Sequence, residues 1–345
     1  MSAPVEDAAA PAAELSWLRE GQRLEAGGRL QAALACYDRA LADAGTCQPA
    51  GSLAWMNRGS VLQRFGDRER AQAALAAYDA AIAGLRHGGT PETTANTISL
   101  AAAWMNRGQL LLRLEGTVAA AAVFDACRAG EDLLVSLLQT DGTAPDAARR
   151  NLGGIRVNRA TLRLDLGDAG GAAEDARQAL AAVAPIERAD LAAATVALMA
   201  RRALCAALGR LLVAPGADQD ALAAEASDLV DDALALARSW GAAGRDAFAP
   251  LVTRLFRFGA GLYRAHQPQF LGEFLLEQLE VAAPPEHRAI ADASLAGALA
   301  DLQRPRPLVA GTPATERLLA AAQNLRAAQA RLLALESAEP PTVLS

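Results

Sequence analysis

The chain has 345 residues, enough for one repeat array or for two ordinary domains. Hydrophobic residues make up 52% of it but aromatic residues only 4%, and most of the apolar content is Ala and Leu, which favour helices over strands. The net charge is −6 and the chain contains no lysine, so nothing resembles the clustered basic surface that nucleic-acid binding requires, and we expect no nucleic-acid partner.

In chain order, residues 1–12 are rich in Ala and Pro and carry no periodic pattern, which predicts a disordered N-terminal lead. Residues 13–184 then show four pairs of helices, and a glycine-containing turn separates the two helices of each pair. The clearest bounds are those of the first pair, at 13–26 and 30–44, and of the fourth pair, at 145–166 and 169–183. This regular alternation predicts an all-α repeat.

One motif recurs at the start of these pairs. Trp55-Met56-Asn57-Arg58-Gly59 returns as Trp104-Met105-Asn106-Arg107-Gly108, with a weaker echo at 157–160. The second helices carry a small, aromatic, small stripe at i, i+4 and i+7, in which alanine replaces the aromatic residue of the fourth pair. The stripes are Ala33, Tyr37, Ala40; Ala74, Tyr78, Ala81; Ala120, Phe124, Cys127; and Ala176, Ala179. In the first helix of the fourth pair, Ala160 replaces the glycine that ends the motif, at the position of Gly59 and Gly108. The small residue allows two helices to approach closely beside the aromatic ring.

The pattern weakens after Pro185, and residues 185–303 are predicted as degenerate helical pairs. The predicted helices span 186–208, 221–240, 246–266, 269–281 and 285–303. Residues 304–345 are predicted as a Pro-rich linker, a C-terminal capping helix that ends near Leu335, and a tail. The sequence does not indicate whether this second half continues the superhelix or folds back over it.

These residues resemble the tetratricopeptide repeat (TPR) family. The resemblance covers residues 13–184 and implies a right-handed superhelical solenoid of helix-turn-helix repeats that binds protein partners. One departure is the spacing, because 49 residues separate Asn57 from Asn106 and 52 separate Asn106 from Asn158, whereas the family repeat is about 34 residues long. The helices or the loops between repeats are therefore expected to be longer than in the family.

In such a solenoid the first helix of each pair lines the concave groove. Helical steps of three and four through Asn57 select a polar stripe that recurs in each pair, and we predict that it binds an extended peptide or a partner helix. The predicted peptide-binding residues are Arg19, Gln22, Asn57, Ser60, Arg64, Asn106, Gln109, Arg113, Asn158 and Thr161.

By resemblance to the family, Asn57, Asn106 and Asn158 would form a ladder that holds a peptide backbone, since an amide both donates and accepts hydrogen bonds. The arginines of the stripe would supply positive charge for an acidic peptide or a C-terminal carboxylate. The alternative is that Asn-Arg-Gly is repeat consensus and that these amides satisfy local groups.

Other repeated residues are interpreted as structural. We expect the arginines that follow the three asparagines to pair with aspartates of the second helices, and the repeated tryptophans to lie in the core. The arginines are Arg58, Arg107 and Arg159, the aspartates are Asp38, Asp79, Asp125 and Asp175, and the tryptophans are Trp17, Trp55 and Trp104.

No catalytic or metal-binding pattern emerges. The histidines do not form a known motif, the four cysteines lack CxxC spacing, and Glu286-His287 is interpreted as a solvated face. The most apolar segment, 191–213, contains Arg201, Arg202 and Arg210, which would be costly in a bilayer. The start lacks the basic and apolar regions of a signal peptide. We therefore expect a cytoplasmic protein without membrane insertion, enzymatic activity, metal or other cofactor.

The favoured function is a protein–protein interaction scaffold that binds its partner in the concave groove. The alternative is a structural or regulatory assembly module that interacts through its convex face or its C-terminal helices. Exposed apolar patches at Phe248, Phe256, Phe258 and Tyr263 would favour this alternative. The partner and the oligomeric state do not follow from the sequence.

Overall fold

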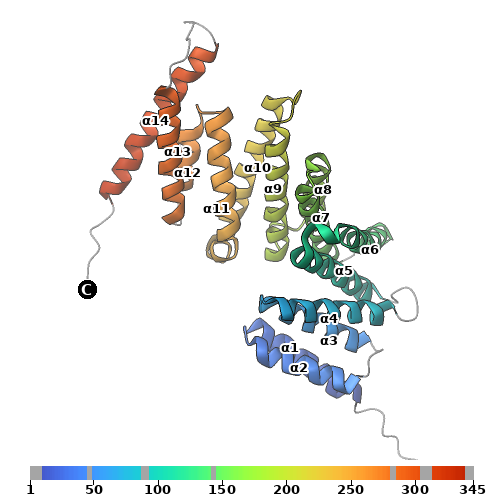
Figure 1. The fold of residues 1–345 in the computed structure, drawn as a ribbon. Helices are drawn as coiled ribbons and strands as arrows, with labels where there is room; N and C mark the ends of the chain where they lie inside the picture. The colour runs from blue at the N-terminus through green and yellow to red at the C-terminus, as the bar shows by residue number, and fades with distance from the viewer. Residues whose placement is uncertain are drawn as a thin grey trace, which may run out of the picture. The chain divides into compact units, whose positions relative to one another are not determined.

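The computed structural model describes residues 10–44, 49–86, 93–140, 145–279, 285–303 and 313–338. Within these ranges the chain forms α-helices and one short 3₁₀ helix, without a strand, so the predicted all-α repeat is confirmed (Figure 1). The chain divides into two compact units, Met1–Ile186 and Glu187–Ser345, which we call unit 1 and unit 2. The predicted N-terminal lead lies mostly outside the described residues, and the first helix already begins at Ala10.

Unit 1 consists of four helical hairpins with a 3₁₀ helix, η1 (Gly116–Ala119), in the turn of the third. The hairpins are α1 (Ala10–Ala26) with α2 (Leu30–Ala44), α3 (Pro49–Arg64) with α4 (Arg68–Arg86), α5 (Thr94–Glu115) with α6 (Ala120–Thr140), and α7 (Asp146–Asp165) with α8 (Ala169–Val183). The long helices α5 and α6, of 22 and 21 residues, account for part of the extended repeat spacing.

The first helices of the hairpins form a continuous layer. Helix α3 contacts α1 and α5, and α5 contacts α7, whereas no two of the second helices α2, α4, α6 and α8 contact each other in the described part of the chain. Helices α2, α4 and α6 instead pack between their own first helix and the next one, and α8 packs on α7. Because stacked elements that lie closer together form the inner side of a curved repeat array, the first helices occupy the side on which the sequence places the polar stripe.

In each of the first two hairpins, the two helices cross at a glycine that faces a buried tyrosine ring. Tyr37 and Tyr78 are 0% and 1% exposed. A Cβ atom added to Gly21 would lie 2.5 Å from Tyr37 Cε1, and one added to Gly59 would lie 2.8 Å from Tyr78 Cε1. These distances are too short for any side chain, so the glycine and the aromatic ring of each crossing fit only each other. The fourth hairpin replaces the pair by small residues, since Ala160 and Ala176 are both fully buried.

The third hairpin departs from the predicted register by one residue. The predicted stripe was Ala120, Phe124 and Cys127. The residue that occupies the aromatic place is Val123, which is fully buried, whereas Phe124 is only half-buried. A Cβ atom on Gly108 would lie 3.4 Å from Ala126 Cβ and 3.9 Å from Val123 Cγ1, an ordinary contact. The 3₁₀ turn before α6 accompanies this shift, and the smaller valine leaves the crossing less tightly filled.

The repeated tryptophans lie at the edge of the core rather than inside it. Trp17, Trp55 and Trp104 are half-buried and pack against core residues of their hairpins. The guanidinium of Arg58 lies 5.5 Å from the ring centre of Trp55, and that of Arg107 lies 5.7 Å from Trp104. Each ring therefore has apolar contacts and a cation–π contact, so the tryptophans pack on the core as predicted but are not enclosed by it.

Unit 2 repeats the arrangement with less regular pairs. Its helices are α9 (Leu191–Leu211), α10 (Gln219–Ser239), α11 (Gly241–His266), α12 (Leu271–Leu279), α13 (Pro285–Gln303) and α14 (Pro313–Ala338). Helix α11 contacts both α9 and α13, so these first helices again lie side by side. Helix α14 packs on α12 and α13. The predicted linker at 304–312 lies outside the described residues.

The aromatic residues of unit 2 form its core. Phe248 and Phe256 are fully buried and Tyr263 is 7% exposed, while Phe258 is half-buried. The Tyr263 and Phe274 rings stack with their centres 4.6 Å apart. The exposed patch that would have favoured the assembly module is therefore not formed by these side chains.

His287 is also buried, contrary to the predicted solvated face. It is 3% exposed, its ring centre lies 4.7 Å from that of Phe256, and its Nε2 atom lies 3.2 Å from Thr253 Oγ1. Burial lowers the pKa of His287, against a smaller opposite effect of Glu286. The imidazole thus belongs to the core of unit 2.

Helix α9, the predicted apolar segment, is long and apolar enough to cross a membrane by length and composition. Within the structure, 61% of its most apolar window is buried. A core helix has the same features, so this observation alone does not place the chain in a membrane.

We predict that Gly59→Ala destabilises the chain by about 1–3 kcal/mol, because the new methyl group would overlap the buried Tyr78 ring. The matched change Gly108→Ala meets no such overlap and is expected to be neutral or to stabilise α5 by up to about 1 kcal/mol. Urea unfolding followed by circular dichroism measures both. Equal effects of the two changes would contradict the close-crossing interpretation.

We predict that unit 2 loses stability in mild acid through His287. Its folded pKa is lowered, so the unfolded chain binds the proton more readily, and the contribution is present above the unfolded pKa near 6.5 and lost as the pH falls through the folded pKa. Urea unfolding at several pH values should show a smaller pH dependence in His287→Gln. The control His266→Gln, at an exposed position, should keep the wild-type dependence.

Candidate functional site

The predicted peptide-binding residues lie on the layer of first helices in unit 1, and we call the side of this layer that carries them the first-helix face. The structure gives them different environments. Four are exposed, four are half-buried with Asn57 among them, one is buried, and Arg64 is exposed but engaged in an ion pair. The exposed four are Arg19, Gln22, Gln109 and Arg113, and the half-buried four are Asn57, Ser60, Asn106 and Thr161.

Glu25 on α1 engages two of the predicted residues. Its carboxylate accepts hydrogen bonds from Tyr37 Oη at 2.9 Å and Ser60 Oγ at 3.1 Å. Arg64 Nη1 lies 3.8 Å from the same carboxylate and donates to the Glu25 carbonyl oxygen at 3.4 Å. Ser60 and Arg64 therefore join α3 to α1, and the positive charge of Arg64 is largely compensated.

Glu25 is not among the residues predicted from the sequence, although its position recurs in the next hairpin. Glu25 and Gln63 each lie four residues after the crossing glycine of their hairpin, and each accepts a hydrogen bond from the buried tyrosine of that hairpin. For Gln63 the distance from Tyr78 Oη to Oε1 is 3.1 Å. The residue four positions after the crossing glycine thus accepts the hydrogen bond of the buried tyrosine hydroxyl in both hairpins.

The three asparagines do not form a uniform open ladder. Asn158 is 8% exposed, and its Nδ2 atom donates to the Met105 carbonyl oxygen at 3.4 Å, which joins α7 to α5. The Asn106 side chain is half-buried and lies near the Tyr78 hydroxyl of the preceding hairpin, where it acts to lower the pKa of that hydroxyl against the larger, raising effect of burial. Asn57 is half-buried, without a hydrogen bond among the described residues. The alternative interpretation, in which the amides satisfy local groups, therefore holds for Asn106 and Asn158.

Two arginines of the first-helix face have uncompensated charge. Arg19 on α1 and Arg113 on α5 are exposed and make no ion pair with any described residue. Gln22 and Gln109, one helical turn from Arg19 and Arg113, are exposed as well. These four side chains are free to contact a partner, whereas Thr161 Oγ1 donates within its own helix to the Val157 carbonyl oxygen at 2.9 Å.

The predicted Arg–Asp pairs link successive hairpins in the first half of unit 1. Arg58 Nε lies 2.7 Å from Asp38 Oδ1, and Arg107 Nε lies 2.6 Å from Asp79 Oδ1. Each aspartate follows a buried tyrosine of the preceding hairpin. The structural interpretation of these arginines is therefore confirmed for Arg58 and Arg107.

The third pair forms with a different acid. Arg159 Nη2 lies 2.7 Å from Asp175 Oδ1 of α8, whereas Asp125 is exposed and lies 4.0 Å from Arg128. The register shift of the third hairpin explains the change, because the residue that follows buried Val123 is Phe124 and not an aspartate. The predicted Arg–Asp pair is therefore confirmed for Arg159 as well, through Asp175, whereas Asp125 pairs with none of the three arginines.

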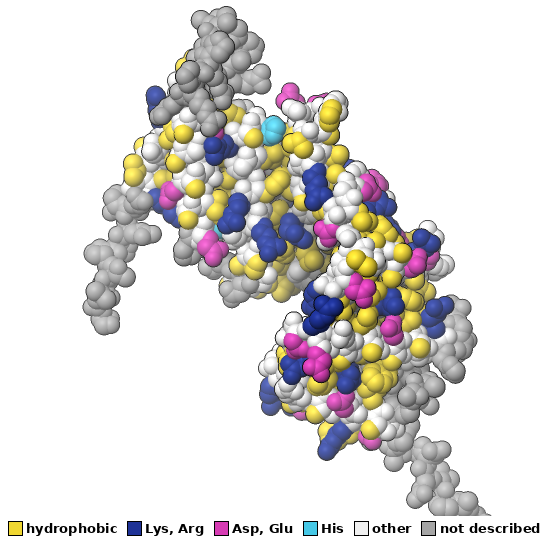
Figure 2. Space-filling model, in the orientation of Figure 1, with side chains coloured by type: hydrophobic (Ala, Val, Ile, Leu, Met, Phe, Trp, Pro, Cys, Tyr) yellow, Lys and Arg dark blue, Asp and Glu magenta, His cyan; other side chains and the backbone are white. Residues whose placement is uncertain are grey.

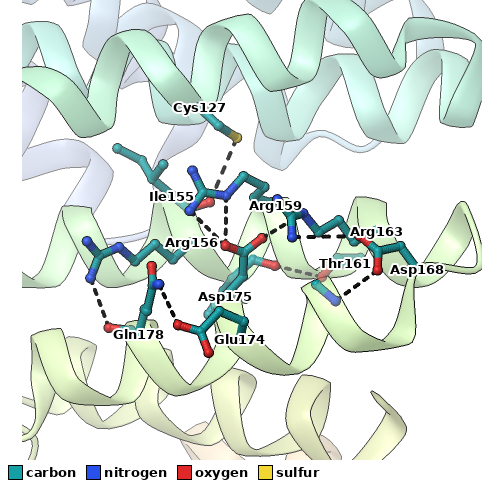
Figure 3. A network of polar contacts seen from close by, with 12 residues as sticks. Cys127, Ile155, Arg156, Arg159, Thr161, Arg163, Asp168, Glu174, Asp175 and Gln178 are labelled. Carbon is teal, nitrogen blue, oxygen red and sulfur yellow. Dashed lines mark hydrogen bonds and ion pairs between the residues drawn. The ribbon is translucent and has the colours of Figure 1, made fainter. Parts of the chain in front are cut away.

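Arg159 belongs to a network that joins α6, α7 and α8 (Figure 3). Asp175, 3% exposed at its side chain, contacts Arg159, and its Oδ2 atom lies 3.1 Å from Arg163 Nε without the alignment of a hydrogen bond. Glu131 of α6 pairs with both Arg156 and Arg159. Burial acts to raise the pKa of Glu131, but these two arginines outweigh it, and its pKa is lowered.

This network has structural rather than catalytic geometry. Its carboxylates are held by arginines, which do not exchange protons near neutral pH. Cys127 beside it is buried, and burial raises the pKa of its thiol to about 12, so the thiolate nucleophile is not available at neutral pH. Among the described residues, no group of three or more His, Cys, Asp and Glu side chains is placed to hold a metal ion.

No protein-family model matches the chain, and no curated protein matches it significantly. Among solved structures, a tetratricopeptide repeat protein from Parabacteroides merdae ATCC 43184 is 14% identical, over 82% of this chain and 99% of that chain, with a TM-score of 0.33. The TPR domain of P58(IPK) is 17% identical, over 95% of this chain and 99% of that chain, with a TM-score of 0.26. The hairpin-repeat architecture of this chain is established by its own helices.

We predict that Asp175→Asn destabilises unit 1 by about 3–5 kcal/mol, because it removes the buried carboxylate that faces Arg159 and Arg163 and leaves Arg159 only Glu131, which it shares with Arg156. The matched change Asp38→Asn removes a half-exposed pair and should cost at most about 1 kcal/mol. Urea unfolding at neutral pH compares the two. A small effect at Asp175 would show that Glu131 alone satisfies Arg159.

Proposed function

We propose that the protein is a non-enzymatic protein-interaction scaffold whose first-helix face in unit 1 binds an extended peptide or a partner helix. The observation that carries the proposal is the set of exposed polar side chains on one continuous layer of helices. Arg19, Gln22, Gln109 and Arg113 remain free after the hairpins have satisfied their own polar groups. Side chains of this kind offer hydrogen bonds to a peptide without any rearrangement of the core.

The charge of these groups favours an acidic ligand. Arg19 and Arg113 lack acidic partners among the described residues, whereas Arg64 between them in the sequence is compensated by Glu25. An acidic peptide or a C-terminal carboxylate would pair with the two free guanidinium groups, which suit carboxylates through their paired N–H donors. Asn57 adds an amide whose hydrogen-bonding groups are not used within the described chain.

The revised set of contact residues differs from the original stripe. Asn106, Asn158, Ser60 and Thr161 support the helices on which the contacts are carried, and we assign them to the scaffold. We further place this scaffold in the cytoplasm, on the sequence features given above. The aromatic side chains whose exposure would have favoured the assembly module are buried or half-buried.

The test is a selection of binding peptides from a displayed random library, with the full chain as bait. Selected peptides are expected to be enriched in Asp and Glu or to require a free C-terminal carboxylate. Their dissociation constants should rise about tenfold with Arg19→Gln and Arg113→Gln together, because two charge pairs are lost. Hydrogen exchange of the complex should show protection in α1, α3 and α5.

The control carries equal charge changes on the second helices, Arg39→Gln and Arg86→Gln, and should bind as the wild type does. Circular dichroism first establishes that all variants are equally helical. If the selected peptides bind the Arg19 and Arg113 variant unchanged, or protect only second helices, the first-helix face is not the binding surface.

A further inference from the structure

Three arginines gather on the first helices of unit 2 without acidic partners. Arg254 and Arg257 are exposed and lie one turn apart on α11, and Arg202 lies on the neighbouring helix α9. None of the three forms a hydrogen bond or an ion pair with a residue that the structure describes. In Figure 2, which shows this side of α9, α11 and α13, arginine side chains gather over α9 and α11.

The cluster is not a general property of the arginines in unit 2. Other arginines there pair with carboxylates, which are Glu187 for Arg201 at 2.9 Å, Glu277 for Arg238 at 2.8 Å, Asp301 for Arg264 at 2.6 Å and Asp292 for Arg288 at 3.2 Å. The neighbours Arg201 and Arg202 differ most clearly, because one is paired and the other is not. The chain thus supplies acids to these arginines but not to the cluster.

Arg202 has an unfavourable environment in the free protein. Its Nε atom is buried without a hydrogen-bond partner. Burial lowers its pKa, and the like charge of Arg254 lowers it further. Two like charges and an unsatisfied donor oppose folding, and a carboxylate placed on this face would offset the repulsion between the charges.

An apolar hollow adjoins the cluster. It has a volume of about 450 Å³, lies between α11 and α13, and is open to solvent. Its lining consists of Arg257, Glu286, Ala289, Ile290, Ala293 and Ser294. Ala289, Ile290 and Ala293 give it an apolar floor that suits an aliphatic side chain, while Arg257 stands at the junction with the arginine cluster. Glu286 is the acidic member of this lining, so any preference for anions comes from the arginines.

We propose that this face of unit 2 binds an acidic segment of a partner protein, with carboxylates on Arg202, Arg254 and Arg257 and an aliphatic side chain in the hollow. A peptide combines the two groups within a few residues, whereas a nucleic-acid backbone offers phosphates but no aliphatic side chain. Single-stranded nucleic acids also bind through exposed aromatic platforms, whereas the two aromatic residues that flank Arg257 are fully buried (Phe256) and half-buried against Gly209 (Phe258). The proposal does not depend on peptide binding by unit 1.

The experiment uses the full chain and a fluorescein-labelled helical peptide that carries Glu side chains and one Leu on the same face. Anisotropy titrations compare the wild type with the triple variant R202Q/R254Q/R257Q. Loss of three charge pairs is expected to weaken binding by about tenfold or more. The matched triple variant R29Q/R68Q/R86Q makes the same charge change at exposed positions of unit 1 and should bind as the wild type does.

A second pair of titrations tests the hollow. Ala293 is exposed on its floor, so Ala293→Leu should fill the hollow without disturbing the core. It is expected to weaken binding of the Leu peptide severalfold and to leave a peptide with Ser in place of Leu unchanged. Thermal unfolding controls for folding, and the triple arginine variant is expected to be at least as stable as the wild type because its substitutions remove mutual repulsion.

Three results would overturn the proposal. The first is equal affinity of the wild type and the triple variant for the acidic peptide. The second is equal binding of a peptide with Gln in place of Glu. The third is tighter binding of a single-stranded oligonucleotide than of the acidic peptide at physiological salt. Loss of binding in the variant Arg19→Gln with Arg113→Gln, but not in the triple variant, would assign the acidic peptide to unit 1 instead.

Discussion

The close approach of two helices at a small residue is the constraint on which unit 1 depends. The core contains few aromatic side chains, so the buried tyrosines Tyr37 and Tyr78 provide much of the apolar area of their hairpins. Each ring packs directly against a glycine of the first helix, which sets how the hairpin closes and which side of that helix faces outward. The polar stripe of the first-helix face follows from this packing, because residues at steps of three and four share one side of a helix, away from the crossing.

Packing also decides the electrostatics. Where the tyrosine is in register, the next residue is an aspartate that reaches the arginine of the following hairpin, as in the Asp38–Arg58 contact. Where Val123 replaces the tyrosine one position earlier, Asp125 points to solvent and Arg159 finds Glu131 and Asp175 instead. The first helix thus fixes the position of the arginine, and the register of the second helices determines which acidic residue pairs with it.

The sequence was sufficient for what depends on local periodicity and insufficient for what depends on contacts between distant residues. Helical hairpins and the crossing at Gly59 follow from spacing within one repeat, and the pair of Arg107 with Asp79 follows from recurrence of the same motif in the next repeat. Asn158 donates a hydrogen bond to a carbonyl oxygen of α5 that lies 53 positions earlier in the chain, and Ser60 donates one to Glu25, 35 positions earlier. A repeat motif cannot distinguish an amide that is open to a ligand from one that is satisfied by the next helix. His287 was misplaced for the same reason, since its burial depends on α11.

The first helices of both units carry arginines with and without acidic partners. In unit 1, Arg64 is matched by Glu25, whereas Arg19 and Arg113 are exposed and form no ion pair with a described residue. In unit 2, Arg202 and Arg254 stand close enough for their charges to oppose each other, and Arg257 continues the cluster. A neutral side chain at these positions would avoid the repulsion. An anionic partner that binds there would offset it, which is the physical basis of the proposed interface in unit 2.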